Sequence, residues 1–572
     1  MPLDTDLRRW CVYGSTIINN NMRGYRMSRE GVVVSQEDPH FLVEYVIRIG
    51  CASEFHLGID PTITRTASGY KFQVSHGGTM RTYTSQQMFF RHRVHHIRGR
   101  ATHVFLVEEE KEKKDEKEKK DQKEEKPVVL KDAWLEVDRL SEEQILSNIF
   151  EVYEKTIPAD CSVVERKQRM ERARRYFIPI ITSWAVQDVV QGMIMTPGDV
   201  EDDDPNSSAG VFHLPRNMAY DQLASATRSL GTSLSENYPP AIPAVRRALY
   251  TPRIKRQRWR TVYGTVGVPL NMVMNVRHVC IVLRDCTAAL MLLTLAKYRH
   301  RDVSLFNMYL VGGDSQEPSG ALSDVEYAAD WTSRSGFHTI RTGTPLFMAT
   351  EKVVSMWLYL PQRPPRHNDI DTHELVHPLT QMPLTRFEPP EDQAASREKI
   401  PIPEFWVTPL HDAEDLYWVA VYKLLYSVPA AHAVPAPRQV EVRKLLFGFA
   451  DTAYRKEFMR FGRVSVPLKT PPNDEEMVPI AFLSWWLVLK DIGAVIAKAH
   501  YDYQTDWNTD VFHLNLERIW LTFVKLVGAM VTDLEIADYA DLKDAAPIQQ
   551  SIPGSESPNQ GRATKKRKTN NA

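Results

Sequence analysis

Hydrophobic and polar residues alternate along several short segments in the first half of the chain. Strand-like patterns occur in FLVEYVIRI (41–49), GYKFQVSH (69–76) and RTYTSQQMFFRHRVHHIR (81–98), which are rich in β-branched and aromatic residues. Two further strands are predicted by THVFLV (102–107) and PVVLKDAW (127–134). The pattern therefore predicts a β-rich first half.

In the second half, apolar residues recur at helical spacing. HVCIVLRDCTAALMLLTLA (278–296) and DLYWVAVYKLLYSV (415–428) both predict helices. An earlier amphipathic helix is predicted in LSEEQILSNIFEVYEK (140–155), where Ser141 is a favourable N-cap and acids occupy the first turn. Strands, one helix and then mostly helices predict a two-lobed α+β arrangement.

Charge runs and proline-rich stretches divide this pattern. The run from Glu108 to Lys126 contains no apolar residue and cannot enter a core, so we expect a long hairpin insertion between the two strands that flank it. Further breaks, dominated by Pro, Gly, Ser and acids, occur at 196–210, 360–374, 386–404 and after about Ala545.

The composition narrows the class of protein. At 572 residues the chain exceeds what one core usually serves, which predicts two to four compact units. Its 71 basic and 72 acidic residues give a net charge of -1, so bulk attraction to nucleic acid or anionic membrane is not expected. Five scattered cysteines without CxxC spacing predict a reducing, intracellular compartment. The longest apolar runs are shorter than the ~20 residues of a membrane span, so no span is expected.

A polar segment, KYRHRDVSLFN (297–307), lies between the apolar runs AALMLLTLA and MYLV. Within it, Asp302 and Asn307 are five residues apart, as in the HRDxxxxN pattern of kinase catalytic loops. Phosphoryl transfer from ATP needs a Lys on the phosphates, an acid that holds it, a carboxylate at the nucleophile, and metal ligands. Candidates for the remaining groups occur in the corresponding order: Lys131 in a strand, Glu142 or Glu143 opening the next helix, and Asp324 in GALSDVEYA.

Several motifs together resemble the fungal-type protein kinases, a divergent branch of the eukaryotic protein kinase-like superfamily. They are LKDAW with RLSEEQIL, HRDVSLFN, ALSDVEYA, RTGTPLFMATE and HDAEDLYWVAVYKLL, in family order. With FLVEYVIRIGCASEFHLGIDPTI upstream, the likeness covers roughly residues 40 to 500.

The resemblance implies a bilobal protein-kinase-like fold of the α+β class, with a β-rich N-lobe that has one main helix and a helical C-lobe. The expected regions are an N-terminal extension (1–85), an N-lobe (86–270) that includes the charged insertion (108–126) and the acidic loop (196–210), a C-lobe (271–530), and a disordered basic tail (545–572).

The same resemblance implies a protein kinase that uses ATP and Mg²⁺ and phosphorylates Ser or Thr of protein substrates. It assigns the ATP phosphates to Lys131, the ion-pair partner of that lysine to Glu142, and the catalytic base to Asp302. Asn307 and Asp324 would ligate magnesium.

Further positions take supporting roles by the same resemblance. Thr342 and Thr344 would lie in the activation segment, which Glu351 would close. His300 and Arg301 would shape the catalytic loop, and Asp412 would brace it from a helix.

The chain departs from the common kinase pattern at three places. Gly99 is the only glycine of the phosphate loop IRGRATHV, the segment Asp324-Val325-Glu326 replaces DFG, and Thr350 replaces the proline of APE. The first two departures, in the phosphate loop and at DFG, motivate an alternative function, a pseudokinase scaffold that binds partners without transferring phosphate.

A remote alternative is a zinc hydrolase, because His373-Glu374-Leu375-Val376-His377 matches HExxH formally. That motif needs a continuous helix, and Pro378 disfavours helical geometry there, so a surface loop is favoured. A second histidine group, His92, His95 and His96, is better explained as a solvated basic strand, since alternation places neighbours on opposite faces.

Two basic segments remain. KKRK (565–568) fits either a nuclear import signal or a solubilising tail, so we expect nuclear or cytoplasmic localisation. RIKRQRWR (253–260) is basic and has an aromatic residue, but it falls where a kinase places a strand leading to the hinge. We therefore expect a structural role there and no specific nucleic-acid partner.

Overall fold

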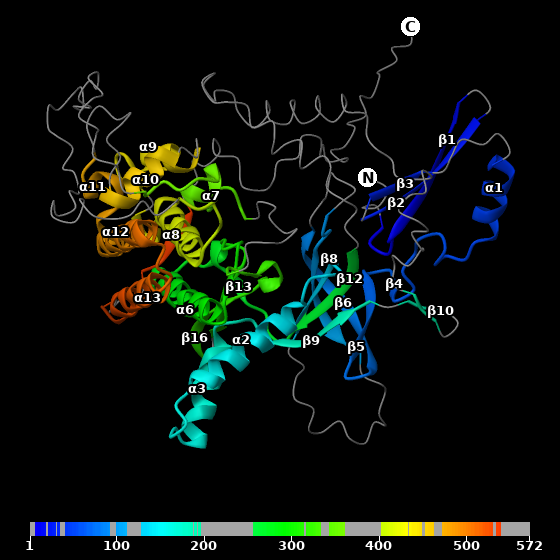
Figure 1. Ribbon diagram of the computed structural model, residues 1–572, viewed down its shortest axis with the longest axis horizontal. Helices are drawn as coiled ribbons and strands as arrows, with labels where there is room; N and C mark the ends of the chain where they lie inside the picture. Colours follow the sequence, from blue (N-terminus) through cyan, green and yellow to red (C-terminus); the bar gives the residue numbers. More distant parts are fainter. Residues whose placement is uncertain are drawn as a thin grey trace, which may run out of the picture. The chain divides into compact units, whose positions relative to one another are not determined.

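A computed structural model shows a mixed α+β chain (Figure 1). Its residues group into two compact units. The first comprises residues 1–273 and 284–342, and the second 274–283 and 343–572, so the division falls within helix α6 (Val276–Leu295). The structure describes residues 6–18, 21–29, 31–34, 41–91, 99–110, 127–186, 188–190, 193–195, 256–313, 316–332, 343–360, 402–432, 434–448, 452–462, 472–529 and 534–538.

A seven-stranded sheet is the centre of the first unit, and all its pairings are antiparallel. Apolar side chains on one face, among them Phe72, Tyr83, Phe105 and Leu130, form a buried core cluster. The strands, in spatial order, are β4 (Ile63–Arg65), β5 (Tyr70–His76), β6 (Thr79–Arg91), β7 (His103–Glu109), β8 (Val128–Glu136), β12 (Arg256–Tyr263) and β9 (Ile180–Ala185).

The strands predicted at 69–76, 102–107 and 127–134 are confirmed as β5, β7 and β8. β7 pairs with β8 in antiparallel register, with Val107 opposite Val128, so the charged run is inserted into a hairpin as expected. The predicted strand at 81–98 is present as β6 up to Arg91. Because β6 runs from 79 to 91, the expected boundary between residues 85 and 86 falls inside a strand.

One predicted strand is wrong. Residues 41–49 form part of helix α1 (Phe41–Cys51), which follows a three-stranded sheet of β1 (Cys11–Ile18), β2 (Asn21–Ser28) and β3 (Gly31–Val34). The segment also has helical spacing, and a short apolar run rich in β-branched residues does not distinguish the two periods. A small hairpin of β10 (Asp188–Val190) and β11 (Met193–Met195) belongs to the same unit.

Helix α2 (Glu142–Thr156) begins where the sequence predicts. The Ser141 side chain accepts a hydrogen bond from Gln144 N–H (3.2 Å), and the Gln144 side chain accepts one from Ser141 N–H (2.8 Å), which completes a capping box. The remaining elements of this unit are α3 (Val163–Arg175), β13 (Val268–Pro269), η3 (Leu270–Met272), β14 (Tyr298–Arg299), β15 (Met308–Gly313), β16 (Gln316–Leu322), η4 (Val325–Tyr327) and β17 (Ala329–Asp330).

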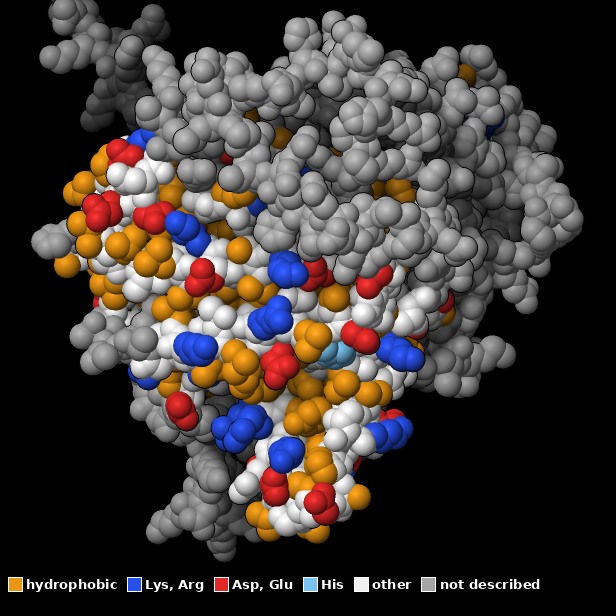
Figure 2. Space-filling model, turned by 60° about the vertical axis from the view of Figure 1, so that its left-hand side comes forward, with side chains coloured by type: hydrophobic (Ala, Val, Ile, Leu, Met, Phe, Trp, Pro, Cys, Tyr) orange, Lys and Arg blue, Asp and Glu red, His pale blue; other side chains and the backbone are white. Residues whose placement is uncertain are grey.

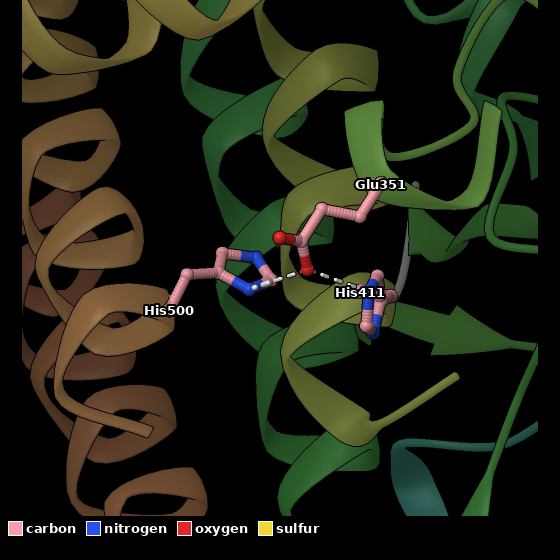
Figure 3. Close-up of side chains that lie close together, drawn as sticks. All are labelled: Glu351, His411 and His500. Carbon is pink, nitrogen blue, oxygen red and sulfur yellow. Dashed lines mark ion pairs between the residues drawn. The ribbon is translucent and has the colours of Figure 1, made fainter. Parts of the chain in front are cut away.

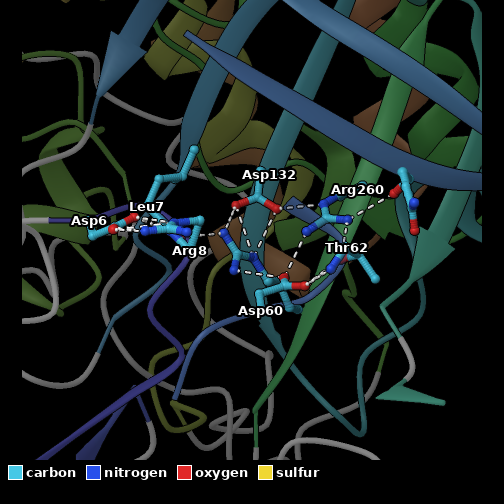
Figure 4. Close-up of polar contacts among 9 residues, drawn as sticks. Asp6, Leu7, Arg8, Asp60, Thr62, Asp132 and Arg260 are labelled. Atoms are coloured by element: carbon cyan, nitrogen blue, oxygen red, sulfur yellow. Dashed lines mark hydrogen bonds and ion pairs between the residues drawn. The ribbon is translucent and has the colours of Figure 1, made fainter. Parts of the chain in front are cut away.

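A buried ion network ties the N-terminal segment to the central sheet (Figure 4). Arg258 and Arg260 lie on the same face of β12, and both pair with Asp132 of β8, at 2.6 and 3.1 Å. Both also reach Asp60, at 2.9 and 2.8 Å. Arg258 and Arg260 are 2% and 0% exposed, so they are core residues and not part of a nucleic-acid surface, as expected for this segment.

Helices dominate the second unit. Large aromatic side chains, including Trp418, Trp485 and Trp486, are fully buried there. The elements are α7 (Thr350–Val354), α8 (Pro409–Leu425), β18 (Ser427–Pro429), η6 (Ala430–His432), α9 (Gln439–Arg443), the π-helical turn η7 (Lys444–Gly448), α10 (Thr452–Phe461), α11 (Asp474–Met477), η8 (Ile480–Phe482), α12 (Leu483–Asp506), α13 (Val511–Ala529) and β19 (Ile536–Asp538).

Two helical segments are long and apolar enough to cross a membrane by length and composition, α6 and residues Ile480–Asp506. The apolar window of α6 is 78% buried, as in the core helix of a folded domain, and that of the second segment is 44% buried. The expected absence of a membrane span stays a prediction.

On the face shown in Figure 2, hydrophobic side chains are interspersed with charges of both signs. This distribution accords with the near-zero net charge of the sequence. Several positions singled out above lie outside the described residues: His92, His95 and His96, most of the charged insertion (111–126), the acidic loop 196–210, Thr342, the HELVH segment 373–377 and the tail 545–572.

Candidate active site

Lys131 is in a central strand of the sheet and points into a cluster of acids. β8 lies between β7 and β12, and its alternation places Lys131 on the face opposite Asp132. The ammonium group makes ion pairs with the carboxylates of Asp324 and Glu326, and it lies 3.8 Å from Glu142 Oε2. Burial opposes the charge of Lys131, but Asp324 and Glu326 outweigh it and raise the pKa well above its ordinary value. Lys131 is therefore a buried cation held by acids.

Glu142, the first residue of α2, links that lysine to the chain around Asp324. One carboxylate oxygen accepts hydrogen bonds from the N–H groups of Asp324 (2.9 Å) and Val325 (3.4 Å). The other accepts from the Tyr263 hydroxyl at 2.5 Å. Burial, together with the Glu142 carboxylate, raises the pKa of Tyr263 well above its ordinary value, so the hydroxyl stays a donor. Glu142 thus positions both the main chain at Asp324 and Val325 and the side chain of Lys131.

Asp324 and Glu326 present two carboxylates to the same side of the site. Asp324 has a left-handed backbone (φ 64°), which is unusual for a residue with a side chain and starts the short turn η4. Burial disfavours its charge, but Lys131 and Arg100 lower its pKa well below the ordinary value. For Glu326, burial and the nearby Asp324 raise the pKa. The two acids therefore share an environment that favours a cation between them.

Arg100 supplies the second cation of the site. It follows Gly99 and precedes Ala101, and both of these neighbours have positive φ (152° and 45°). Its guanidinium pairs with Glu326, lies 3.6 Å from Asp324, and stacks on the Tyr327 ring at 3.9 Å. Burial opposes its charge, but the acids raise the pKa of Arg100 well above the ordinary value, with a smaller contribution from Asp302.

The segment with Asp302 is bound to the segment with Asp324. His300 is fully buried and its Nε2 lies 2.9 Å from the Ser323 carbonyl. Asn307 Nδ2 donates to the Asp302 carbonyl (2.8 Å), and Ser323 N–H donates to the Asn307 carbonyl (2.9 Å). Arg301, which lies between His300 and Asp302 in the chain, has a left-handed backbone (φ 77°). These bonds hold the HRD loop against Asp324 and leave the Oδ1 of Asn307 available as a metal ligand.

The charges of the site do not balance. Lys131 and Arg100 carry two positive charges, whereas Glu142, Asp324 and Glu326 carry three negative charges when all are ionised, a formal net of -1. A largely buried excess of carboxylates is costly, so the site favours a further cation. Two cationic side chains and carboxylate oxygens suit a phosphate group with its metal ion.

Three other predicted residues lie in the second unit. Thr344 is partly buried, and its carbonyl accepts a hydrogen bond from Phe347 N–H at 2.9 Å. Glu351 is fully buried in α7, and Asp412 is buried in the first turn of α8. Their predicted roles remain proposals.

The geometry agrees with a comparison of the sequence with known families. The model of the fungal protein kinases matches residues 3–424, which is most of the chain. This chain belongs to the fungal protein kinase family. No curated protein matches it. Among solved structures, it is similar to vaccinia related kinase 3, with 11% identity, 80% of this chain and 90% of that chain covered, and a TM-score of 0.32.

Within this fungal protein kinase, the structure brings together Lys131, Glu142 and Asp324, which sequence reasoning had placed in one site. The sequence analysis did not identify Glu326 and Arg100 as members of this site. Glu326 had a detectable signal, because an acid stands where DFG has glycine. Arg100 had a weaker one, since it follows the single glycine of the phosphate loop but contacts residues more than 220 positions away.

Proposed function

We propose that this fungal protein kinase transfers the γ-phosphoryl group of ATP to Ser or Thr hydroxyls of protein substrates. The observation that supports this most is the convergence of Lys131, Asp324 and Glu326, from distant parts of the chain, in one largely buried site that holds more acids than cations. Such a site suits the cationic metal and the phosphates of a nucleotide.

The residues present fit Mg²⁺. Carboxylate and amide oxygens are the ligands that it prefers, and Asp324, Glu326 and the Oδ1 of Asn307 offer them. When bound, Mg²⁺ offsets the charge of the phosphates during transfer.

Each side chain then has a separate task. Lys131 exchanges its carboxylate partners for phosphate oxygens, and Glu142 keeps the lysine and the Asp324 main chain in place. Asp302 orients the substrate hydroxyl and accepts its proton. The chain thereby contributes positioning and electrostatic stabilisation, which carry most of the catalysis in phosphoryl transfer.

The test is transfer of labelled phosphate from ATP to a Ser/Thr peptide library, with wild type, Asp302→Asn and Asp330→Asn. Asp330 is exposed, and within the part of the chain that the structure describes its carboxylate accepts hydrogen bonds from Thr332, so its variant is a matched control with unchanged activity. Asp302→Asn should lower the rate about 10²- to 10⁴-fold while ATP binding persists.

Other results would count against the proposal. Phosphotyrosine as the labelled product would contradict Ser/Thr specificity. A folded wild type that binds ATP with magnesium but labels nothing would replace the proposed function with the pseudokinase scaffold. Equal rates in wild type and Asp302→Asn would remove Asp302 from the mechanism.

A further inference from the structure

Three fully buried side chains of the second unit point toward one another: Glu351 of α7, His411 of α8 and His500 of α12 (Figure 3). Glu351 Oε2 lies 3.2 Å from His411 Nε2 and 3.5 Å from His500 Nδ1. The three potential donor atoms all lie within 4.8 Å of one another. They come from segments that are 60 to 150 residues apart in the chain, and nothing in the proposed phosphoryl transfer uses them.

The two distances are longer than those of a typical charge-assisted hydrogen bond. Charge-assisted N–H···O bonds are about 2.7–2.9 Å long, whereas two ligands on a tetrahedral zinc with bonds of about 2.0–2.2 Å are about 3.3–3.5 Å apart. The observed 3.2 and 3.5 Å are close to the second value. Among the described residues, moreover, none of these three atoms makes a hydrogen bond of good geometry, and the 3.2 Å contact of His411 Nε2 with Glu351 Oε2 is an ion pair only if His411 is protonated. Buried polar atoms without partners are costly, and here they converge on one point.

Neighbouring groups fix the orientation of the Glu351 carboxylate. Glu351 Oε1 accepts hydrogen bonds from the Leu358 N–H (2.5 Å) and from Gln504 Nε2 (2.8 Å), which directs the other oxygen, Oε2, toward the two histidines. A metal-binding carboxylate is typically fixed in this way by its other oxygen.

His500 has a carboxylate behind it. Its Nε2 lies 3.2 Å from Glu414 Oε2, and the other oxygen of Glu414 accepts hydrogen bonds from Thr350 N–H (2.7 Å) and Trp418 Nε1 (3.0 Å). A carboxylate behind the distal ring nitrogen is the usual support of a metal-bound histidine, because it fixes the tautomer with a lone pair toward the metal.

His411 is supported by Thr408. Its Nδ1 lies 2.9 Å from the Thr408 hydroxyl and 3.3 Å from the Thr408 carbonyl, which would accept from an Nδ1–H tautomer and leave Nε2 free to ligate. To bind a metal, His411 must exchange the hydrogen bond that its Nδ1 accepts from the Thr408 N–H (2.9 Å) for one of these. The opposite tautomer accepts from Thr408 N–H (2.9 Å) and donates from Nε2 to Glu351, which requires no metal. The two tautomers make opposite predictions about metal content.

We propose that Glu351, His411 and His500 bind a zinc-class divalent cation. Two imidazoles and a carboxylate form a donor set that suits Zn²⁺, and three protein ligands leave a position for water. With Glu351 and Glu414 ionised, the cation makes the buried group neutral, since two negative charges meet two positive ones. The ion joins α7, α8 and α12, and the site is independent of the proposed kinase reaction.

The test is the metal content of the purified full chain, together with Co²⁺ binding to chelator-treated protein followed by its visible absorption. Wild type should hold stoichiometric zinc in excess magnesium, and Co²⁺ should give the spectrum of a low-coordinate N/O site. His500→Gln should lower bound zinc at least about tenfold. His513→Gln is the matched control, because His513 is an exposed residue of α13, and this variant should bind as much zinc as wild type.

The HELVH segment offers a rival zinc source within the same chain, so a His373→Ala, His377→Ala double variant is measured in parallel. Retention of zinc by that variant and its loss in His500→Gln support the proposal, and the reverse pattern overturns it. Absence of zinc from wild type, with no Co²⁺ binding, also overturns it and assigns the metal-free tautomer. Because wild type can be tested without any substitution, misfolding of His500→Gln does not decide the outcome.

Discussion

Arg100 and Glu326 are the two residues that distinguish this site from one made only of the expected motif residues. Their pair adds one positive and one negative charge beside Lys131 and Asp324, and Tyr327 holds the guanidinium from one side. Since Arg100 lies against both acids, it occupies the position where a metal ion is expected to bind. Arg100 is thus an internal counter-ion that a metal must compete with.

Removing Arg100 should therefore strengthen metal binding. In Arg100→Ala the acids lose a cation within 4 Å, which is worth about 1 kcal/mol even in a water-like environment, so Mn²⁺ should bind about fivefold tighter or more without nucleotide. Titration calorimetry measures this. Arg139→Ala is the control, because Arg139 also lies over the Tyr327 ring, at 5.3 Å, but pairs with Glu136. Unchanged or weaker binding in Arg100→Ala would contradict the counter-ion role.

His103 gives the fold a dependence on pH. Burial lowers its pKa to about 4, against an ordinary value of 6.5, although Asp132 opposes this. A depressed pKa means that the neutral ring favours the folded state above pH 6.5, and that this stability is lost as the pH falls toward 4. The loss amounts to about 3 kcal/mol at pH 4, at about 1.4 kcal/mol per unit. Denaturant unfolding from pH 7 to pH 4 should show a shallower decline for His103→Gln, and parallel curves would exclude His103 as the cause.

Among the helices and strands, the sequence predicted those elements whose position depends on a local pattern of residues. α2 begins at Glu142 because Ser141 caps it, and β7 and β8 flank the charged run because their alternation is clear. α1 was missed because a nine-residue apolar segment fits both periods, and surrounding structure then decides. The contact of Arg100 with Glu326 joins residues 226 positions apart, so local pattern could suggest each residue separately but not their pairing.

The pairing of β8 with β12 depends on the buried network of Asp132. In Asp132→Asn, Arg258 and Arg260 would each lose one of the two carboxylates that they share, leaving that of Asp60, so two buried cations are less well compensated. Such a loss costs about 3–5 kcal/mol, which denaturant unfolding would detect. Glu151→Gln, which breaks only the exposed pair with Lys155, should leave stability unchanged. A loss no larger in Asp132→Asn than in Glu151→Gln would show that the network is dispensable.

For the whole molecule, motif order along the chain identified the family, whereas the arrangement of the two units was not predictable from it. The sequence places the HRD segment in a C-lobe, yet by compactness residues 284–342 group with the central sheet. The reason is visible in the bonds, because Leu322 and Phe177 form a parallel bridge and Asp324 N–H donates to Glu142. The proposed nucleotide site is consequently contained in one unit, and the Glu351, His411 and His500 group in the other.

This separation predicts two independent responses in hydrogen exchange. A ligand stabilises the structure that binds it, so ATP with Mg²⁺ should slow exchange most in peptides of 99–110, 127–186, 256–273, 284–313 and 316–332. Chelation of a bound zinc ion should instead speed exchange in peptides of 343–360, 402–425 and 483–506. Asp324→Asn should abolish the first response and keep the second, and His500→Gln should do the opposite. Nucleotide protection confined to the second set of peptides would refute the placement of the site, because every proposed nucleotide ligand belongs to the first unit.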